Sequence, residues 1–275
     1  FTLPWYARVA EETSRCVKAY YAHDTFRFYG WKRERIVHME GRLLNACDLA
    51  LAVASRVAED LEGLSTCPVR YFPMATCWTP EGAKSLATTT PADIAAIPKP
   101  RVGSVGTVCG PATDLELLHR LTSDLPYVQF VLIGPLDPNA KADGKARTIL
   151  AKPNVHCLGR KEHSELPAYL QQFDVCVNLL RVSEHNNRRS PLRLFDYLTS
   201  DRPVVSTPIE EAFRHLPHIA IAEDPERFIA MLMTAISGRM PIDLQARREY
   251  MLHQTWSARG NQLMTWLQNP ADYGS

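Results

Sequence analysis

The strongest constraint on the fold is a repeated alternation of short apolar runs with longer amphipathic segments. The segments 101–105, 128–133 and 174–180 have the length and apolar character expected of strands, with the strongest apolar run at 128–133, and the pattern at 31–47 has the length and periodicity of a helix. Alternation of this kind is typical of a parallel sheet covered by helices. The sequence therefore predicts the α/β class.

The charge balance excludes one broad class of partner. The chain carries 31 Lys and Arg against 30 Asp and Glu, which gives a formal net charge of +1. A domain that binds the phosphate backbone of a nucleic acid is strongly basic. We therefore expect no nucleic-acid partner, and any recognition of phosphate must be local.

The cysteines and the hydropathy pattern bear on location. The 7 cysteines are scattered singly, without a C-x-x-C pair, and free thiols are typical of a reducing compartment. We recognise neither a signal peptide nor an apolar run long enough to cross a bilayer. The pattern predicts a cytoplasmic protein.

Proline content divides the chain into regions. The segment 76–100 is rich in proline and has little periodicity, so we place a linker at 81–100. An α/β domain is expected at 1–80 and a second one at 101–240. The stretch 241–275 is expected to form C-terminal helices that pack back across the domains.

The segment 174–207 carries the chemistry. A buried strand is followed by a basic loop, then by Ser190 and Pro191, then by a helix. Serine is a good N-cap, proline is favoured at the first helical position, and a helix N-terminus binds phosphate. Arg193 adds a guanidinium group, and the carboxylate of Asp196 is placed to face a ribose. An ordinary solvated basic loop before a helix explains the pattern equally well.

A family resemblance favours the first interpretation. Residues 191–198 (PLRLFDYL) and 201–207 (DRPVVST) resemble the PLK-x-x-EY signature of group 1-like GT-B glycosyltransferases. Further segments match in the family's order: 48–61, 100–108, 131–135, 158–160, 166–167 and 256–257. The resemblance implies two Rossmann-like domains, of which the N-terminal, acceptor-side one is incomplete, because its opening strands have no match before Phe1.

The same resemblance implies the donor-binding residues. Gly106 and Thr107 would lie against the donor diphosphate, and Gly159 and Arg160 would flank the nucleobase. These four residues place the binding of the nucleotide sugar in the domain 101–240.

The remaining donor-binding residues come from the helix start. The backbone of Ser190, Pro191 and Leu192 would face phosphate. Arg193 stands where the family has lysine and would neutralise the leaving diphosphate, and Asp196 stands where it has the ribose-binding glutamate.

One departure concerns sugar recognition. The first glutamate of the family's E-x7-E pattern falls at Arg188, with Glu184 and Asn187 as nearby substitutes. At this position the chain therefore lacks the glutamate that many relatives have.

The function implied is transfer of a sugar from a UDP- or GDP-linked donor to a glycan or lipid-linked acceptor in cell-surface polysaccharide or glycoconjugate biosynthesis. We find no D-x-D pair placed to hold a metal, so metal-independent transfer is expected, with no cofactor beyond the donor. His23 and Asp24 follow a predicted strand and are the candidates for the base that receives the acceptor proton. A polar pair that merely closes the strand is one alternative for them, and a retaining enzyme that needs no such base is another.

Two other functions remain open. A nucleotide-sugar epimerase could share the fold, and a non-catalytic nucleotide-binding or partner-binding module would fit a short first domain. Trp31 lies beside Lys32, Arg33 and Arg35. This arrangement fits either a solvated helix face or peripheral contact with an anionic membrane, such as the inner face of the cell membrane.

Overall fold

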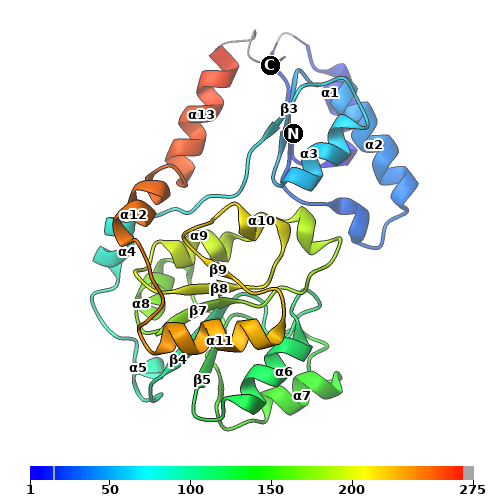
Figure 1. Ribbon diagram of the computed structural model, residues 1–275. Coiled ribbons are helices and arrows are strands. Elements are labelled where there is room, and N and C mark those ends of the chain that lie inside the picture. The colour runs from blue at the N-terminus through cyan, green and yellow to red at the C-terminus, as the bar shows by residue number, and fades with distance from the viewer. Residues whose placement is uncertain (15, 269–275) are drawn as a thin grey trace. The chain divides into compact units, whose positions relative to one another are not determined.

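The computed structural model describes residues 1–14 and 16–268, and the chain forms two compact units (Figure 1). Unit 1 comprises Phe1–Ala75, Ser183–Pro191 and the C-terminal residues from Trp256. Unit 2 comprises Thr76–Val182 and Leu192–Thr255. The α/β class expected from the sequence is confirmed in both units.

Unit 1 is built on three parallel strands in the order β1-β2-β3. The strands are β1 (Ala19–Ala22), β2 (Leu49–Ala52) and β3 (Val69–Tyr71). Its helical segments are η1 (Pro4–Tyr6), α1 (Ala7–Glu12), η2 (Phe26–Phe28), α2 (Arg33–Asn45), α3 (Ser55–Glu62), η4 (Asn186–Arg188) and α13 (Trp256–Gln268). Because β2 is central, all four of its residues are buried.

The core of unit 1 has two parts. Leu43 and Leu44 of α2 pack with Tyr20 of β1 on one side of the sheet. On the other side, Leu49, Leu51 and Phe72 pack with side chains of α13 such as Trp266. The C-terminal helix thus belongs to the unit formed by the start of the chain. Residues 269–275 of the expected 241–275 segment lie outside the described residues.

Unit 2 is built on six parallel strands in the order β6-β5-β4-β7-β8-β9. The strands are β4 (Arg101–Val105), β5 (Gln129–Ile133), β6 (Val155–Cys157), β7 (Val175–Asn178), β8 (Val204–Ser206) and β9 (Ala220–Ile221). The first strand in the chain lies in the middle, and the sheet grows outward to each side in turn, as in a doubly wound fold.

Helices connect these strands and contribute to the core. They are α4 (Pro80–Leu86), α5 (Ala92–Ala95), α6 (Leu115–Asp124), α7 (Gly144–Leu150), η3 (His163–Glu165), α8 (Leu166–Leu170), α9 (Leu192–Leu198), α10 (Glu210–Phe213), α11 (Pro225–Ile236) and α12 (Leu244–Leu252). The segment expected as a linker, 81–100, holds most of α4 and all of α5. Unit 2 begins at Thr76.

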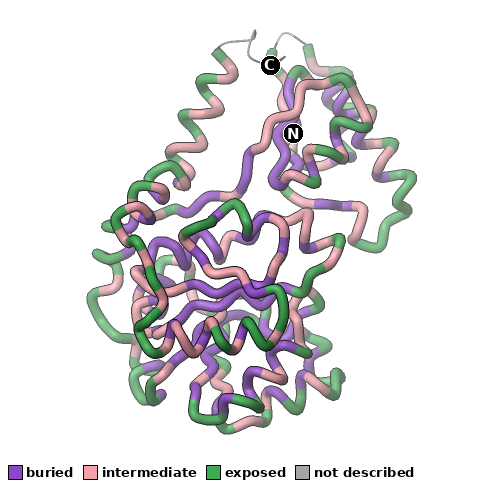
Figure 2. The backbone as a smooth tube through the Cα atoms, viewed as in Figure 1, coloured by how far each residue is buried: buried purple, intermediate pink, exposed green. Residues whose placement is uncertain are grey.

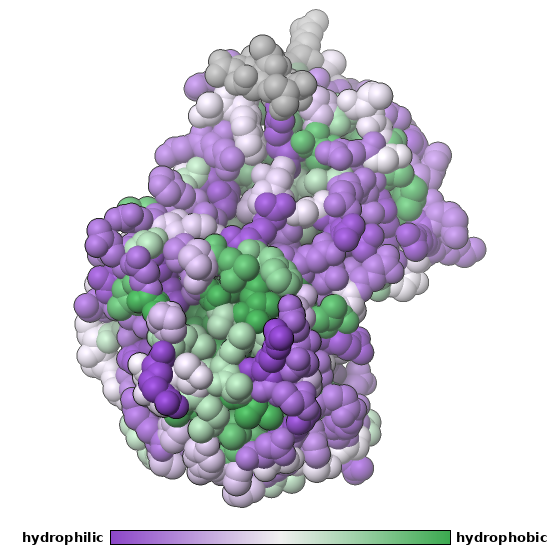
Figure 3. All heavy atoms as spheres, in the orientation of Figure 1, coloured by the Kyte–Doolittle hydropathy of each residue, from purple (hydrophilic) through white to green (hydrophobic). Residues whose placement is uncertain are grey.

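Burial follows the sheet of unit 2 closely (Figure 2). Every residue of β7 and β8 is buried, because helices cover the central strands on both faces. Apolar side chains also gather on the face shown in Figure 3, where Figure 1 draws β9 and α11. There a groove is lined by Ile219, Met231 and Met240. No described helix combines the length and the apolar character needed to cross a membrane.

Candidate functional site

The central strands of unit 2 separate toward their carboxyl ends. Strands β4 and β7 are paired only at Val102 with Val175 and at Gly103 with Cys176. Further on, the backbone N–H of Val105 donates instead to the hydroxyl of Tyr197 on α9, at 2.7 Å. The strand order reverses at this point, and doubly wound sheets bind ligands outside the carboxyl ends of the strands at such a reversal.

Two glycine residues pack against each other where β4 and β5 end, next to the reversal of strand order. We call this region the corner after β4. Gly106 follows β4 with φ of +131°, and a Cβ atom there would lie 2.2 Å from Nη2 of Arg193. Gly134 follows β5 with φ of +143°, and its Cβ would lie 2.0 Å from the carbonyl oxygen of Gly106. Only glycine adopts this backbone readily and permits these approaches. The guanidinium group of Arg193 is therefore held directly over the turn after β4.

Three of the predicted donor-binding residues lie together in this corner. Gly106, Thr107 and Arg193 line one cavity of about 20 Å³. Its other walls are largely apolar, with Leu132 and Leu179 among them. The described residues contain no group of three or more His, Cys, Asp or Glu arranged to hold a metal ion.

Asp196 is buried and both of its carboxylate oxygens have partners within unit 2. Oδ1 accepts a hydrogen bond from the hydroxyl of Thr76 at 3.0 Å, and Oδ2 lies 3.1 Å from Nε2 of His163. The hydrogen bond to Asp196 raises the pKa of His163, against a smaller opposing effect of burial. The His163 ring stacks on Trp78 with 4.2 Å between ring centroids. The carboxylate predicted to bind ribose thus belongs to a cluster of protein side chains.

Sequence reasoning missed Thr76, Trp78 and His163. The first two lie in the proline-rich segment 76–100, just before the predicted linker, and this segment has no periodic pattern to place them. His163 follows the segment matched to the nucleobase loop by only a few residues. This proximity to a matched motif is the sequence signal that could have identified His163.

The nucleobase candidates occupy a different place. Gly159 follows β6 with φ of +69°, and its carbonyl oxygen accepts a hydrogen bond from the N–H of Gly134 at 2.9 Å. Arg160 is exposed. Neither residue lines the cavity beneath Arg193.

The helix start differs from the sequence expectation by one residue. Helix α9 begins at Leu192, whereas Ser190 and Pro191 belong to unit 1. The hydroxyl oxygen of Ser190 accepts a hydrogen bond from the backbone N–H of Met74 at 3.2 Å. The Ser190 side chain is therefore attached to the segment that follows β3.

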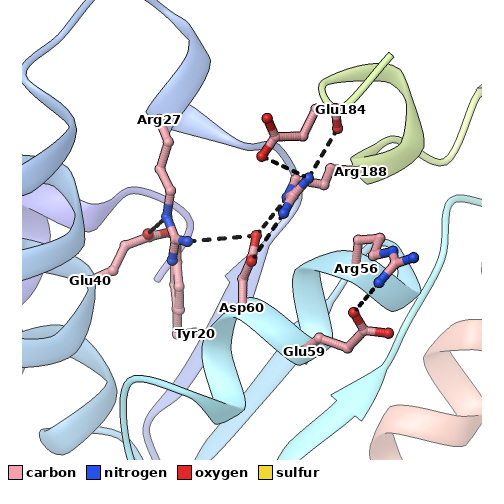
Figure 4. A network of polar contacts seen from close by, with 8 residues as sticks. All are labelled: Tyr20, Arg27, Glu40, Arg56, Glu59, Asp60, Glu184 and Arg188. Carbon is pink, nitrogen blue, oxygen red and sulfur yellow. Dashed lines mark hydrogen bonds and ion pairs between the residues drawn. The ribbon is translucent and has the colours of Figure 1, made fainter. Parts of the chain in front are cut away.

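Partly buried charges hold the loop 183–191 within unit 1 (Figure 4). Nε of Arg188 lies 2.7 Å from Oδ2 of Asp60, and Arg27 contacts the same carboxylate at 3.6 Å. Arg27 also pairs with Glu40 at 3.0 Å, and Glu40 accepts a hydrogen bond from the hydroxyl of Tyr20. Burial raises the pKa of Glu40 despite these partners.

This network accounts for one departure from the family pattern. Arg188, which stands at the first position of the E-x7-E pattern, pairs with Asp60 and with the carboxylate of Glu184. Its side chain is 15% exposed. In this chain the position serves to attach the loop to α3.

His23 and Asp24 lie in unit 1, directly after β1. The Asp24 carboxylate accepts hydrogen bonds from the hydroxyl of Tyr29 at 2.6 Å and from the N–H of Thr25 at 2.8 Å. Burial and the bond to Asp24 raise the pKa of Tyr29 to about 12. The exposed imidazole of His23 packs edge-on against Phe26. Of the two base candidates, His23 is the more accessible.

Comparison with known sequences gives two matches. The profile of a family described as glycosyl transferase-like matches residues 114–265. TuaH of Bacillus subtilis (strain 168), a protein assigned as a glycosyltransferase of teichuronic acid biosynthesis, is 27% identical over 144 residues. That match covers 52% of this chain and 33% of TuaH, so the chain matches about a third of this relative's length.

Comparison with solved structures finds the same architecture at low sequence identity. The trehalose-6-phosphate synthase OtsA superposes with a TM-score of 0.73 at 13% identity, covering 96% of this chain and 70% of OtsA. A UDP-forming trehalose-phosphate synthase from Burkholderia xenovorans gives 0.67 at 16% identity, covering 98% of this chain and 72% of the synthase. Anabaena Alr3699/HepE, solved with UDP and glucose, gives 0.70 at 12% identity, covering 91% and 71%. These structures therefore contain regions with no counterpart in this chain.

Proposed function

Because this chain belongs to the glycosyl transferase-like family and has the GT-B fold, we propose that it transfers a sugar from a nucleoside-diphosphate donor to a hydroxyl group of a glycan or lipid-linked acceptor. A UDP-linked donor is favoured over a GDP-linked one, since one structural relative is described as UDP-forming and another was solved with UDP. A role in cell-surface polysaccharide synthesis follows the assignment of TuaH.

The observation that carries the proposal is the position of Arg193 over Gly106 at the strand-order reversal. Cleavage of a sugar–phosphate bond builds negative charge on the leaving diphosphate. A cation already fixed where that charge develops stabilises the transition state more than the ground state. Arginine suits this task because its planar group binds phosphate through two parallel hydrogen bonds.

The other residues receive roles around this centre. We assign the backbone at Gly106 and Thr107 to the diphosphate, and Asp196 to the ribose once the hydrogen bond with His163 has been released. Gly159 and Arg160 remain assigned to the nucleobase, and the backbone at Ser190, Pro191 and Leu192 to phosphate. Transfer is proposed to need neither a metal ion nor a further cofactor.

For the acceptor we assign His23 as the base and Asp24 as its polar neighbour. His23 is exposed after a strand end, whereas both oxygens of Asp24 already accept hydrogen bonds. A neutral imidazole can take the proton of an attacking hydroxyl near neutral pH. The working location is proposed to be the cytoplasm.

Titration calorimetry with UDP, GDP and their sugars tests the donor assignment. Arg193→Ala should weaken nucleotide binding by about 10- to 100-fold, the value of a charge-assisted hydrogen bond. Arg193→Lys should retain part of the affinity. Arg147→Ala changes an exposed arginine on α7 and is the matched control. Normal nucleotide binding by Arg193→Ala would refute the assignment.

Turnover separates an enzyme from a binding module. Slow hydrolysis of one bound nucleotide sugar, retained in the presence of EDTA and lost in Arg193→Ala, supports metal-independent transfer. Nucleotide binding without any hydrolysis or transfer would instead favour a non-catalytic module. His23→Ala should reduce transfer to an acceptor while leaving nucleotide affinity unchanged.

A further inference from the structure

Unit 1 carries a groove of about 600 Å³ between η1 and the start of α2, which the donor site does not use. We call it the aromatic groove. Its walls include Trp5, Trp31, Lys32, Arg35, Ile36 and Met39. Indole rings and methylene-rich side chains therefore make most of its surface.

The two tryptophans are exposed yet fixed in place. Trp5 is 41% exposed and Trp31 is 49% exposed. Their rings meet edge-on at 5.2 Å, and Trp5 also packs edge-on against the buried Phe26 at 5.4 Å. Large apolar side chains that gather at the surface typically mark an interaction site. The contact with Phe26 orders the rings before any partner arrives.

Positive charge collects at the edge of the groove. Lys32, Arg33 and Arg35 are all exposed, and Glu34 is the only acidic residue in this run. Within the described part of the chain, no acidic side chain forms an ion pair with any of the three cations. By contrast, Arg42 on the same helix is paired with Glu11. The unneutralised cations thus lie beside the exposed indoles.

We propose that the aromatic groove docks unit 1 on an anionic lipid bilayer. Indole rings prefer the boundary between headgroups and acyl chains, because they have an apolar body and a polar N–H. Lys32, Arg33 and Arg35 contact the negatively charged headgroups, as basic residues do at peripheral membrane sites. Docking brings unit 1 to the surface where a lipid-linked acceptor would be found, and so goes beyond the proposed transfer.

The composition of the groove disfavours a glycan as its occupant. Sugar hydroxyls need both donors and acceptors of hydrogen bonds, which carboxylate and amide side chains supply. The groove walls offer the cations of Lys32 and Arg35 but no carboxylate or amide side chain. An anionic surface matches this set better than a neutral, hydroxyl-rich ligand.

Vesicle flotation of the full chain provides the test. Binding is expected to vesicles that contain phosphatidylglycerol at low salt, to fall as salt is raised, and to be weak with phosphatidylcholine alone. Equal binding to both kinds of vesicle, or binding to neither, would overturn the proposal.

Charge reversal locates the surface. The double variant Lys32→Glu/Arg35→Glu should weaken binding to anionic vesicles by at least about tenfold. Lys141→Glu/Arg147→Glu makes the same change on exposed residues of unit 2 and should have a much smaller effect. Equal losses in the two variants would show that only net charge matters and would refute a defined surface. Circular dichroism and UDP affinity, both expected to be unchanged, separate this result from misfolding and from failure of the donor site.

A conservative aromatic change tests the indoles separately. Acyl-brominated lipids should quench the fluorescence of the wild type, and Trp5→Phe/Trp31→Phe should lose most of this quenching while still binding. The chain has three other tryptophans, Trp78, Trp256 and Trp266, which should remain fluorescent. Unchanged quenching in the double variant would place the membrane contact elsewhere and contradict the proposal.

Discussion

The two units position their polar residues by different physical means. In unit 2, the corner after β4 is set by steric contact, since Gly134 fits against the carbonyl of Gly106 and leaves no room for a side chain. In unit 1, the loop 183–191 is set by charge, through the pairs from Arg188 to Asp60 and from Arg27 to Glu40.

This difference has consequences for how each region responds to conditions. Close packing between uncharged groups changes little with salt or pH. Partly buried ion pairs depend on the ionisation of both partners and weaken as ions screen the exposed parts. The corner beneath Arg193 should therefore keep its geometry under conditions that loosen the loop 183–191.

The largest effect is expected from Gly134→Ala. The new methyl group would lie 2.0 Å from a backbone oxygen, at a φ of +143°. We expect a loss of about 3 kcal/mol or more in the free energy of unfolding, from overpacking together with backbone strain. Urea denaturation measures it. Gly144→Ala, where a Cβ meets nothing within 4 Å, should stay within about 0.5 kcal/mol of the wild type. A mild effect of Gly134→Ala would contradict the view that steric contact sets the corner after β4.

Tyr197→Phe should have the next largest effect. The variant removes the hydroxyl that accepts the N–H of Val105 between the diverging strands, and the orphaned donor should cost about 2 kcal/mol. The loss should be the same at low and high salt. Tyr127→Phe, which changes an exposed tyrosine, serves as control. A salt-dependent loss in Tyr197→Phe would show that charge also contributes to this corner.

Arg188→Ala tests whether ion pairs hold the loop 183–191 in unit 1. Asp60 would lose its 2.7 Å partner and keep the longer, 3.6 Å contact with Arg27. We expect a loss of about 1 to 2 kcal/mol at low salt, because both side chains are largely buried. The loss should shrink as salt is raised.

The control for that variant lies on the neighbouring helix. Arg56 pairs with Glu59 at the exposed surface of α3 (Figure 4), so Arg56→Ala should change stability by less than about 0.5 kcal/mol. Equal losses in Arg188→Ala and Arg56→Ala would mean that the ion pairs of Arg188 do not hold the loop.

The smallest effect is a pH dependence in unit 2. The bond to Asp196 raises the pKa of His163 above 6.5. Its stabilisation is therefore fully present below pH 6.5 and is lost as pH rises through the higher folded-state pKa. The difference in Tm between the wild type and His163→Ala should accordingly be larger at pH 5.5 than at pH 8.

His156 gives a control of opposite sign. Burial lowers its pKa, so its contribution is present above pH 6.5 and is lost as pH falls. The Tm difference between the wild type and His156→Ala should be smaller at pH 5.5 than at pH 8. If both histidine variants followed the same trend, a general pH effect would explain the data, and His163 would have no special link to Asp196.

Parts of this architecture could be predicted from local pattern. The strand predicted at 101–105 coincides with β4, and the apolar run at 128–133 contains β5. Short segments with apolar residues, bounded by glycine and polar residues, favour strands, so both could be predicted locally. The matched motifs also placed Gly106, Thr107 and Arg193 in one site, and these residues line one cavity.

Other parts could not be predicted. The segment at 81–100 lacks periodicity because α4 and α5 are too short to show it. Ser190 was expected to start a helix, but its hydroxyl accepts the N–H of Met74, which lies 116 residues earlier. No local pattern distinguishes a serine that caps a helix from one that is engaged by a distant strand end.

The amino-acid sequence by itself determined the α/β class and most of the strands, because apolar patterning is recorded in consecutive residues. The placement of Gly106 and Arg193 in one site came instead from the family resemblance. Only the tertiary structure decided which partners the charged side chains take, since Arg188 and Asp60 are 128 residues apart and Thr76 and Asp196 are 120 apart. Pairs of this kind form only after the chain has folded, and one sequence taken alone carries no record of them.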